Sequence, residues 1–299
     1  MPPAVLEVDR IAKSYGQVVA CRDVSFTVAP GEIFGFVGSN GAGKTTIMRI
    51  VLGVLAPDAG AVRLGGEPVT PSTRRRIGYL PEERGLYPRM RVLDQLVYLA
   101  ELHGMTTNDA HRAAELWIAR LRLRDRRGDR VQQLSLGDQQ RMQLAAALVH
   151  DPDALVLDEP FAGLDPGAVD VLSEVLRERA DAGAPVLFSS QALDLVERVC
   201  DRIGIIQNGH MVATGTVDEL SAGSRVELLV DAPDAPAGWA AAVPGVEVLD
   251  VHNGRTRLHL EDGVDDQAVL TAALATGPVR EFTRVRPTLA ELYRDVVVP

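Results

Sequence analysis

The chain has 299 residues, of which 46% are apolar and 24% charged, and this composition excludes an intrinsically disordered protein. The net charge of −10 excludes broad electrostatic binding to nucleic acid, because such binding needs a basic face. Apolar runs stay shorter than the ~18 residues of a membrane-spanning helix, and the start lacks the pattern of a signal peptide. Only Cys21 and Cys200 are cysteines, which favours a reducing cytosol over a disulfide framework or a zinc site.

Residues up to about 84 alternate short β-type runs with turns. The predicted strands are Val5–Val8, Val24–Val28, Ile33–Val37, Ala61–Leu64 and Ile77–Leu80. One helix interrupts them, from near Gly43 to near Gly53, where apolar residues recur at helical spacing. The pattern predicts strands that frame one early helix.

Two further blocks complete the larger part of the chain. Residues 85–150 have helical spacing, broken by the Arg-rich stretch Arg120–Arg130, which we interpret as a solvated connector. From residue 154 to about 220, the strands Ala154–Leu157, Pro185–Ser189 and Arg202–Gln207 alternate with the helices Val169–Leu176 and Ala192–Val199. This alternation predicts a parallel sheet covered by helices, with residues 85–150 as an insertion into that α/β domain.

Residues 223–299 are predicted to form a separate small α+β domain. The expected elements are strands 225–230, 245–251, 255–260 and 279–285 and helices 235–242, 265–275 and 288–296. Asn253-Gly254 is a strong hairpin signal, and the order βαββαβ is that of a ferredoxin-like fold. His252 and His259 flank the hairpin without a third ligand, so we interpret them as surface histidines.

A glycine-rich loop after the strand Ile33–Val37 matches the pattern G-x-x-x-x-G-K-[ST]. Its glycines let the backbone fold around phosphates, and the N–H groups of the following helix face the anion. Lys44 is expected to reach the β and γ phosphates, and Thr45 to offer its hydroxyl to Mg²⁺. The predicted nucleotide-binding residues here are Gly38, Ser39, Asn40, Gly41, Ala42, Gly43, Lys44, Thr45 and Thr46.

A second nucleotide motif follows the apolar strand Ala154–Leu157. Asp158 at its end has the Walker B arrangement and is expected to bind Mg²⁺. Glu159 is positioned to orient and activate water as a general base. Because ligands bind at the carboxyl ends of strands in open α/β sheets, the two motifs together predict one ATP site.

The stretch Leu134–Arg141, with sequence LSLGDQQR, resembles the signature of the ATP-binding cassette (ABC) superfamily. Over residues 4–220 the chain therefore resembles the nucleotide-binding subunit of an ABC transporter. The resemblance implies a P-loop core with an antiparallel β subdomain and an inserted helical subdomain. It also implies that Ser135, Gly137 and Asp138 bind ATP held by another subunit, although Leu136 and Asp138 depart mildly from the usual signature.

Two further matches concern the adenine and the subunit contact. Tyr15 corresponds to the aromatic that stacks on adenine in the family, and Ala162–Asp165 resembles the D-loop that crosses to the partner. The chain has one P-loop and one signature. The resemblance therefore implies that two copies, or this chain and a paralogue, sandwich two ATP molecules as a homodimer or heterodimer.

Two positions differ from the family in ways that affect chemistry. Glu82 stands where Gln is usual, and a carboxylate can still bind Mg²⁺. This PEERGLY form resembles a sodium- and drug-efflux subgroup that carries a small C-terminal domain. Gln191 stands where a histidine contacts the γ-phosphate, and it can donate a hydrogen bond but carry no positive charge. We therefore expect slower hydrolysis, or one type of site that is specialised for binding.

The resemblance implies an ATP-hydrolysing subunit that drives a separate integral-membrane permease, with export favoured over import. It implies a cytoplasmic protein, peripheral on the inner face of the cell membrane, that couples to the permease through Gly85–Leu102. The apolar residues of this segment, Leu86, Tyr87 and Met90, fit either a docking patch or buried core. The alternative is a non-transport or weakly hydrolysing regulatory ATP-binding module, which Gln191 keeps open. The transported substrate and the role of residues 223–299 do not follow from the sequence.

Overall fold

The structure is a computed structural model that describes residues 4–83, 85–221, 226–236, 238–261, 263–285 and 288–297. The chain divides into two compact units, Met1–Thr216 and Val217–Pro299. The predicted domain boundary at 222/223 falls in a stretch that lies outside the described residues, as does Arg84 of the PEERGLY motif. That boundary stays a prediction.

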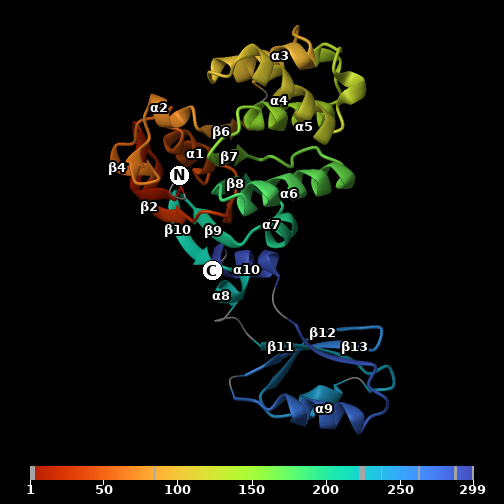
Figure 1. Cartoon of the computed structure of the whole chain (residues 1–299). Helices are drawn as coiled ribbons and strands as arrows, with labels where there is room; N and C mark the ends of the chain where they lie inside the picture. Colours follow the sequence, from red (N-terminus) through yellow and green to blue (C-terminus); the bar gives the residue numbers. More distant parts are fainter. Residues whose placement is uncertain are drawn as a thin grey trace. The chain divides into compact units, whose positions relative to one another are not determined.

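A six-stranded sheet forms the centre of the first unit, in the order β10-β9-β3-β8-β7-β6 (Figure 1). Its strands are β3 (Ile33–Val37), β6 (Ile77–Leu80), β7 (Ala154–Asp158), β8 (Val186–Ser190), β9 (Arg202–Gln207) and β10 (His210–Gly215). All neighbours pair in parallel except β10, which was not predicted and pairs antiparallel with β9. The parallel strands β3, β7 and β8 are buried at every position, as expected for strands covered on both faces.

Helices connect the parallel strands β7, β8 and β9, as the alternating pattern predicted: α6 (Pro166–Asp181) lies between β7 and β8, and α7 (Leu193–Val199) lies between β8 and β9. The early helix α1 (Lys44–Val51) follows β3 and leads to the second sheet. Helix α6 begins earlier and ends later than the predicted Val169–Leu176. The Asp165 carboxylate accepts a hydrogen bond from the Ala168 N–H at 2.9 Å and Pro166 occupies the first turn, so this end is well capped.

An antiparallel sheet packs over α1, in the order β2-β1-β4-β5. It contains β1 (Leu6–Tyr15), β2 (Val18–Val28), β4 (Ala59–Leu64) and β5 (Glu67–Pro68), followed by the short helix α2 (Pro71–Arg74). The strands β1 and β2 are longer than predicted. Register shifts along their pairing break the alternation of apolar and polar residues, so the sequence pattern identified only part of each strand. This sheet is the antiparallel β subdomain that the resemblance implied.

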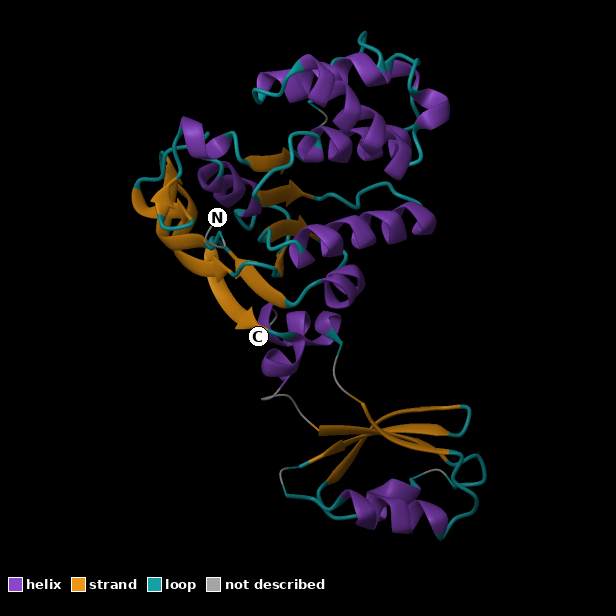
Figure 2. Ribbon diagram, in the orientation of Figure 1, coloured by secondary structure: helices purple, strands orange, loops and turns teal. Residues whose placement is uncertain are grey.

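The inserted block is helical, as predicted. It contains α3 (Val92–Leu102), α4 (Thr107–Arg120) and α5 (Leu136–Leu148), with the 3₁₀ turns η1 (Arg124–Arg126) and η2 (Val131–Gln133) (Figure 2). The segment before α3 pairs with the segment before η2, since the Val131 N–H donates to the Met90 carbonyl at 3.0 Å. The intervening arginines Arg122, Arg124, Arg126 and Arg127 are exposed, in agreement with a solvated connector.

The second unit has an antiparallel sheet in the order β12-β13-β11-β14. Its elements are α8 (Val217–Ser221), β11 (Val226–Asp231), η3 (Trp239–Ala242), β12 (Val246–His252), β13 (Arg255–Leu260), α9 (Asp266–Leu274), β14 (Glu281–Val285) and α10 (Leu289–Val297). Counted from β11, this is the strand order 2-3-1-4 that a split βαβ arrangement produces. The predicted helix 235–242 is wrong: only a 3₁₀ turn forms after Gly238, whose φ of 81° lies in the left-handed region.

Candidate nucleotide-binding site

The P-loop connects β3 to α1, and its glycines are required by this chain's own backbone. Gly43 has φ +105°, and a Cβ there would lie 2.4 Å from the Ala20 carbonyl oxygen. A Cβ on Gly38 would lie 2.5 Å from the Ile206 carbonyl oxygen. Side chains at these positions would displace the neighbouring β2 and β9, so the loop can pass close to them only as glycine.

The Lys44 ammonium is held inside this loop. It is 7% exposed and donates to the carbonyl oxygens of Gly38 at 2.7 Å and Ser39 at 3.2 Å. Burial lowers the pKa of Lys44, and nearby carboxylates, with Glu159 first among them, oppose this shift. The backbone therefore positions the Lys44 ammonium, and acidic side chains lie near it.

Asp158 and Glu159 lie at the carboxyl end of β7, which β8 separates from the P-loop strand β3. Asp158 is 1% exposed, and its Oδ1 accepts a hydrogen bond of 2.5 Å from the Ser189 hydroxyl. Its Oδ2 is buried without a hydrogen-bond partner among the described residues. A buried carboxylate oxygen without a partner is costly, so this atom is suited to a ligand that the chain itself does not provide.

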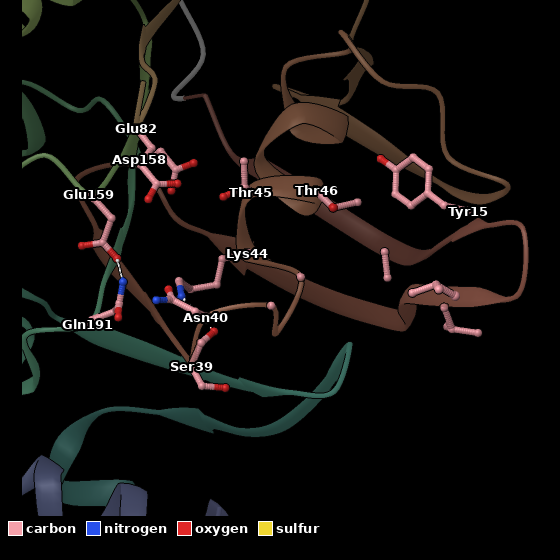
Figure 3. Close-up of a pocket in the computed structure, with 15 residues that line it drawn as sticks. Tyr15, Ser39, Asn40, Lys44, Thr45, Thr46, Glu82, Asp158, Glu159 and Gln191 are labelled. Carbon is pink, nitrogen blue, oxygen red and sulfur yellow. Dashed lines mark hydrogen bonds between the residues drawn. The ribbon is translucent and has the colours of Figure 1, made fainter. Parts of the chain in front are cut away.

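Glu159 begins the turn after β7, with φ +49°. Burial raises the pKa of its carboxyl, while a hydrogen bond from Gln191 opposes this shift. The Gln191 amide donates to Glu159 Oε1 at 3.3 Å, so the residue that replaces the usual histidine contacts the predicted base (Figure 3). A carboxylate whose pKa is raised is suited to accept a proton from water.

These groups surround a cavity of about 340 Å³. Figure 3 shows Lys44 between the carboxylates and the P-loop, with Tyr15 at the opposite end. The lining residues are Tyr15, Val18, Val19, Ala20, Ser39, Asn40, Gly41, Gly43, Lys44, Thr45, Thr46, Glu82, Asp158, Glu159 and Gln191. Gly38 and the buried Ala42 support the loop without lining the cavity. Tyr15 is half exposed and lines the cavity with an aromatic ring, a group that can stack on a planar ring.

The donor set fits Mg²⁺. Glu82, Asp158 and the Thr45 hydroxyl supply oxygen atoms on one side of the cavity, and the unpartnered Asp158 Oδ2 is an oxygen that could bind a cation. Mg²⁺ is a hard ion that prefers such oxygen ligands together with phosphate. Without a cation, neighbouring carboxylates in a partly buried site would repel each other.

The signature residues Ser135, Gly137 and Asp138 do not line this cavity. Ser135 begins α5: its hydroxyl accepts from the Asp138 N–H at 3.1 Å and donates to the Asp138 carboxylate at 2.8 Å. A Cβ on Gly137 would meet only the Gly163 carbonyl oxygen, at 3.9 Å. The described chain therefore gives no packing reason for glycine at position 137.

Sequence reasoning missed four residues of this region. Val18, Val19 and Ala20 of β2 line the cavity beside Tyr15, and Ser189 of β8 contacts Asp158. No local motif marks them, because they enter the site only through strand pairing. The order of strands in the sheet is the signal that could have located Ser189.

Comparison with known proteins decides the family. Residues 21–162 match the ABC transporter family, and residues 215–297 match the C-terminal domain of DrrA1-3-like ATP-binding proteins. The chain is 33% identical to the uncharacterized ABC transporter ATP-binding protein YhaQ of Bacillus subtilis (strain 168), over 98% of each chain. The chain belongs to the ABC transporter ATP-binding proteins.

Other relatives of this ABC ATP-binding protein are named for export or resistance. It is 40% identical to the Nod factor export ATP-binding protein I of Paraburkholderia xenovorans, over 74% of each chain. It is 33% identical to the linearmycin resistance protein LnrL of Bacillus subtilis, over 72% of this chain and 70% of that one. A solved ATP-binding subunit of an ABC transporter superposes with a TM-score of 0.69 at 32% identity, covering 73% of this chain and 92% of the other.

Proposed function

We propose that this ABC ATP-binding subunit hydrolyses Mg²⁺-bound ATP to drive an exporting membrane permease. The observation that carries the proposal is the single cavity in which Lys44, Asp158 and Glu159 converge. Lys44 and the P-loop N–H groups bind the phosphates, and Tyr15 packs against the adenine. Thr45, Glu82 and Asp158 would hold Mg²⁺, which neutralises phosphate charge when bound. Glu159 accepts the proton of the attacking water.

Gln191 determines the rate of ATP hydrolysis that we expect. As a neutral amide it can donate to a phosphate oxygen, but a charge-assisted hydrogen bond is roughly twice as strong. In the described structure this amide instead donates to Glu159 Oε1. We expect slow turnover, and Gln191→His should raise the rate because an imidazolium adds positive charge near the γ-phosphate.

Mg²⁺-dependent ATP hydrolysis by the purified chain tests the proposal. We expect slow turnover in the wild type, loss of at least about 100-fold in Glu159→Gln from the missing general base, and a gain in Gln191→His. A wild-type rate equal to that of Glu159→Gln would favour the alternative, a regulatory module that binds ATP without useful turnover. Equal rates for the wild type and Gln191→His would contradict the role given to Gln191.

The working unit is proposed to be a dimer of cassettes. The signature of a single chain does not reach the cavity, while the space at Gly137 and the N-terminus of α5 suit a phosphate from outside the chain. ATP bound at the P-loop of one copy would then contact Ser135 and Gly137 of another. Whether the second cassette is identical or a paralogue is tested by the mass of the ATP-bound complex.

A second hollow of about 320 Å³ is the proposed permease contact. It lies between the helical subdomain and the central sheet, and it is lined mostly by apolar groups such as Leu52, Val54, Leu86, Leu99 and Ala146. Beside it, Tyr87 and Tyr98 are 49% and 40% exposed and stack edge to face with ring centroids 6.1 Å apart. Exposed aromatic and apolar groups of this kind are typical of binding surfaces.

Binding to the permease through this hollow would hold the protein at the cytoplasmic face of the membrane. In the described part of the chain, no helix is long and apolar enough to cross a bilayer. The test is co-purification with the membrane protein encoded beside its gene. Leu86→Asp should abolish co-purification and leave the ATPase rate of the isolated chain unchanged; retained co-purification would contradict the assigned face.

A further inference from the structure

Strand β8 lies between the two strands that carry the nucleotide motifs. It pairs with β3, which leads into the P-loop, and with β7, which ends in Asp158. Ser189 of β8 stands opposite Asp158 in the register and is fully buried. Because paired residues of parallel strands project to the same face of a sheet, the Ser189 hydroxyl is carried to the Asp158 carboxylate.

The hydroxyl forms two hydrogen bonds whose directions are fixed by chemistry. The Glu159 N–H can only donate, and it lies 3.0 Å from Ser189 Oγ, so the serine oxygen accepts there. The one hydroxyl proton is then free for Asp158 Oδ1, at 2.5 Å. Ser189 therefore donates to the carboxylate and accepts from the next residue's backbone at the same time.

Each of these bonds restrains a different part of the site. The bond to Oδ1 prevents the Asp158 carboxylate from rotating and leaves Oδ2 as the oxygen without a partner among the described residues. The bond to the Glu159 N–H holds the first residue of the turn, which has the left-handed φ of +49°. Backbone in this region persists only where surrounding contacts fix it.

The neighbouring serine does not share these contacts. Ser190 is 2% exposed, and its hydroxyl accepts from the Ala192 N–H at 3.1 Å, at the start of the segment that leads to α7. Both serines are thus buried, at 0% and 2% exposure, and they have the same side-chain chemistry. Only Ser189 contacts the β7 carboxyl end, which makes Ser190 a matched control.

We propose that Ser189 is a positioning residue that orients Asp158 for the metal–nucleotide complex and holds Glu159 in the direction of the attacking water. The proposal rests on the proposed function, in which Asp158 binds Mg²⁺. Ser189 acts through Asp158 and Glu159 without touching nucleotide. Partners that orient a metal ligand commonly contribute about 10- to 100-fold to metal affinity.

The test measures metal binding without turnover. Mn²⁺ replaces Mg²⁺, and its affinity for the full chain saturated with a non-hydrolysable ATP analogue is followed by electron paramagnetic resonance. Ser189→Ala should weaken Mn²⁺ binding about tenfold, while affinity for the nucleotide in EDTA stays within about twofold. Ser189→Thr retains the hydroxyl and should restore most of the Mn²⁺ affinity. Ser190→Ala should leave it unchanged.

Turnover gives a second readout. Ser189→Ala should lower kcat and raise the Mg²⁺ concentration for half-maximal rate, with the KM for ATP at saturating Mg²⁺ nearly unchanged. If Ser189→Ala does not fold, Ser189→Cys replaces it, because the thiol fills nearly the same space but is a weaker donor. Mn²⁺ affinity in Ser189→Ala or Ser189→Cys equal to that of the wild type would overturn the proposal, as would equal losses in Ser190→Ala.

Failure of the proposed function would have a different signature. A wild-type chain that binds Mn²⁺ with the nucleotide analogue but does not hydrolyse ATP would refute turnover, and the comparison of Ser189 with Ser190 would still stand. A wild-type chain that does not bind Mn²⁺ with the analogue would overturn the role of Asp158 and that of Ser189 together.

Discussion

At the scale of single residues, some motif glycines are required by close contacts within the described chain, and others are not. Gly38 and Gly43 approach neighbouring carbonyl groups so closely that a methyl group would clash. Gly137 has no such neighbour in the described chain, although it lies in the first turn of α5, where alanine is the better helix former. We therefore propose that the glycine leaves room for an outside partner, which the proposed ATP sandwich provides.

Gly137→Ala should accordingly separate folding from association. We expect the free energy of unfolding to stay equal or rise by up to about 1 kcal/mol, because alanine replaces glycine in a helix. ATP-dependent dimerisation, measured by size-exclusion chromatography in a Glu159→Gln background, should weaken at least about tenfold. Gly43→Ala is the contrasting control, since it should lose ATP binding itself; an undisturbed dimer in Gly137→Ala would contradict the phosphate role of α5.

At the scale of elements, α3 and α5 meet through two stacked histidines. His103 caps α3 and His150 follows α5, with ring centroids 3.6 Å apart and an interplanar angle of 16°. His103 Nδ1 lies 3.0 Å from the Arg75 carbonyl oxygen, whereas neither His150 ring nitrogen has a hydrogen-bond partner among the described residues. Burial, with the neighbouring His103, lowers the pKa of His150 from 6.5 to about 4.

This pair should make the helical subdomain sensitive to acid. The unfolded chain takes up a proton at His150 near pH 6.5 and the folded chain only near pH 4, so stability falls as the pH drops through that window. The loss should reach about 3 kcal/mol near pH 4. His150→Phe keeps a stacked ring and should flatten the dependence in urea titrations. His111 is exposed, so His111→Gln should leave the pH dependence of stability as it is in the wild type. An unchanged pH dependence in His150→Phe would contradict the role given to His150.

At the scale of the whole molecule, the two units have separate cores. The second unit buries its own apolar cluster, which includes Leu228, Val230 and Leu258. The nucleotide cavity is lined by residues of the first unit alone. We therefore propose that the second unit is an accessory domain whose stability is independent of the nucleotide.

Calorimetry of the full chain should show two unfolding transitions. ATP with Mg²⁺ should raise the midpoint temperature of only one transition, because a ligand stabilises the part of the chain that binds it. Leu258→Ala removes a fully buried side chain and should destabilise only the other transition, by about 2–5 kcal/mol. A single transition that responds to both changes would contradict the independence of the two units.

The motifs along the chain were enough to indicate the family and to predict which residues bind the phosphates. Gly38 to Thr45, and Asp158 with Glu159, are contiguous motifs, and their chemistry depends on spacing along the chain and on a strand that ends beside them. Hydrophobic periodicity likewise predicted the parallel sheet and the helical insertion. It failed at residues 235–242, where Gly238 stops a helix. It also missed the part of β1 that follows Val8 and the part of β2 that precedes Val24.

Contacts between side chains that are distant in the sequence became visible only in the folded chain. Ser189 reaches Asp158 because β8 pairs with β7, and Gln191 reaches Glu159 at the same sheet edge. The histidine stack and the apolar hollow form where α3 and α5 approach each other and the central sheet. Such contacts depend on strand order and helix packing, and these are set by burial summed over the whole unit, which no local spacing of residues encodes.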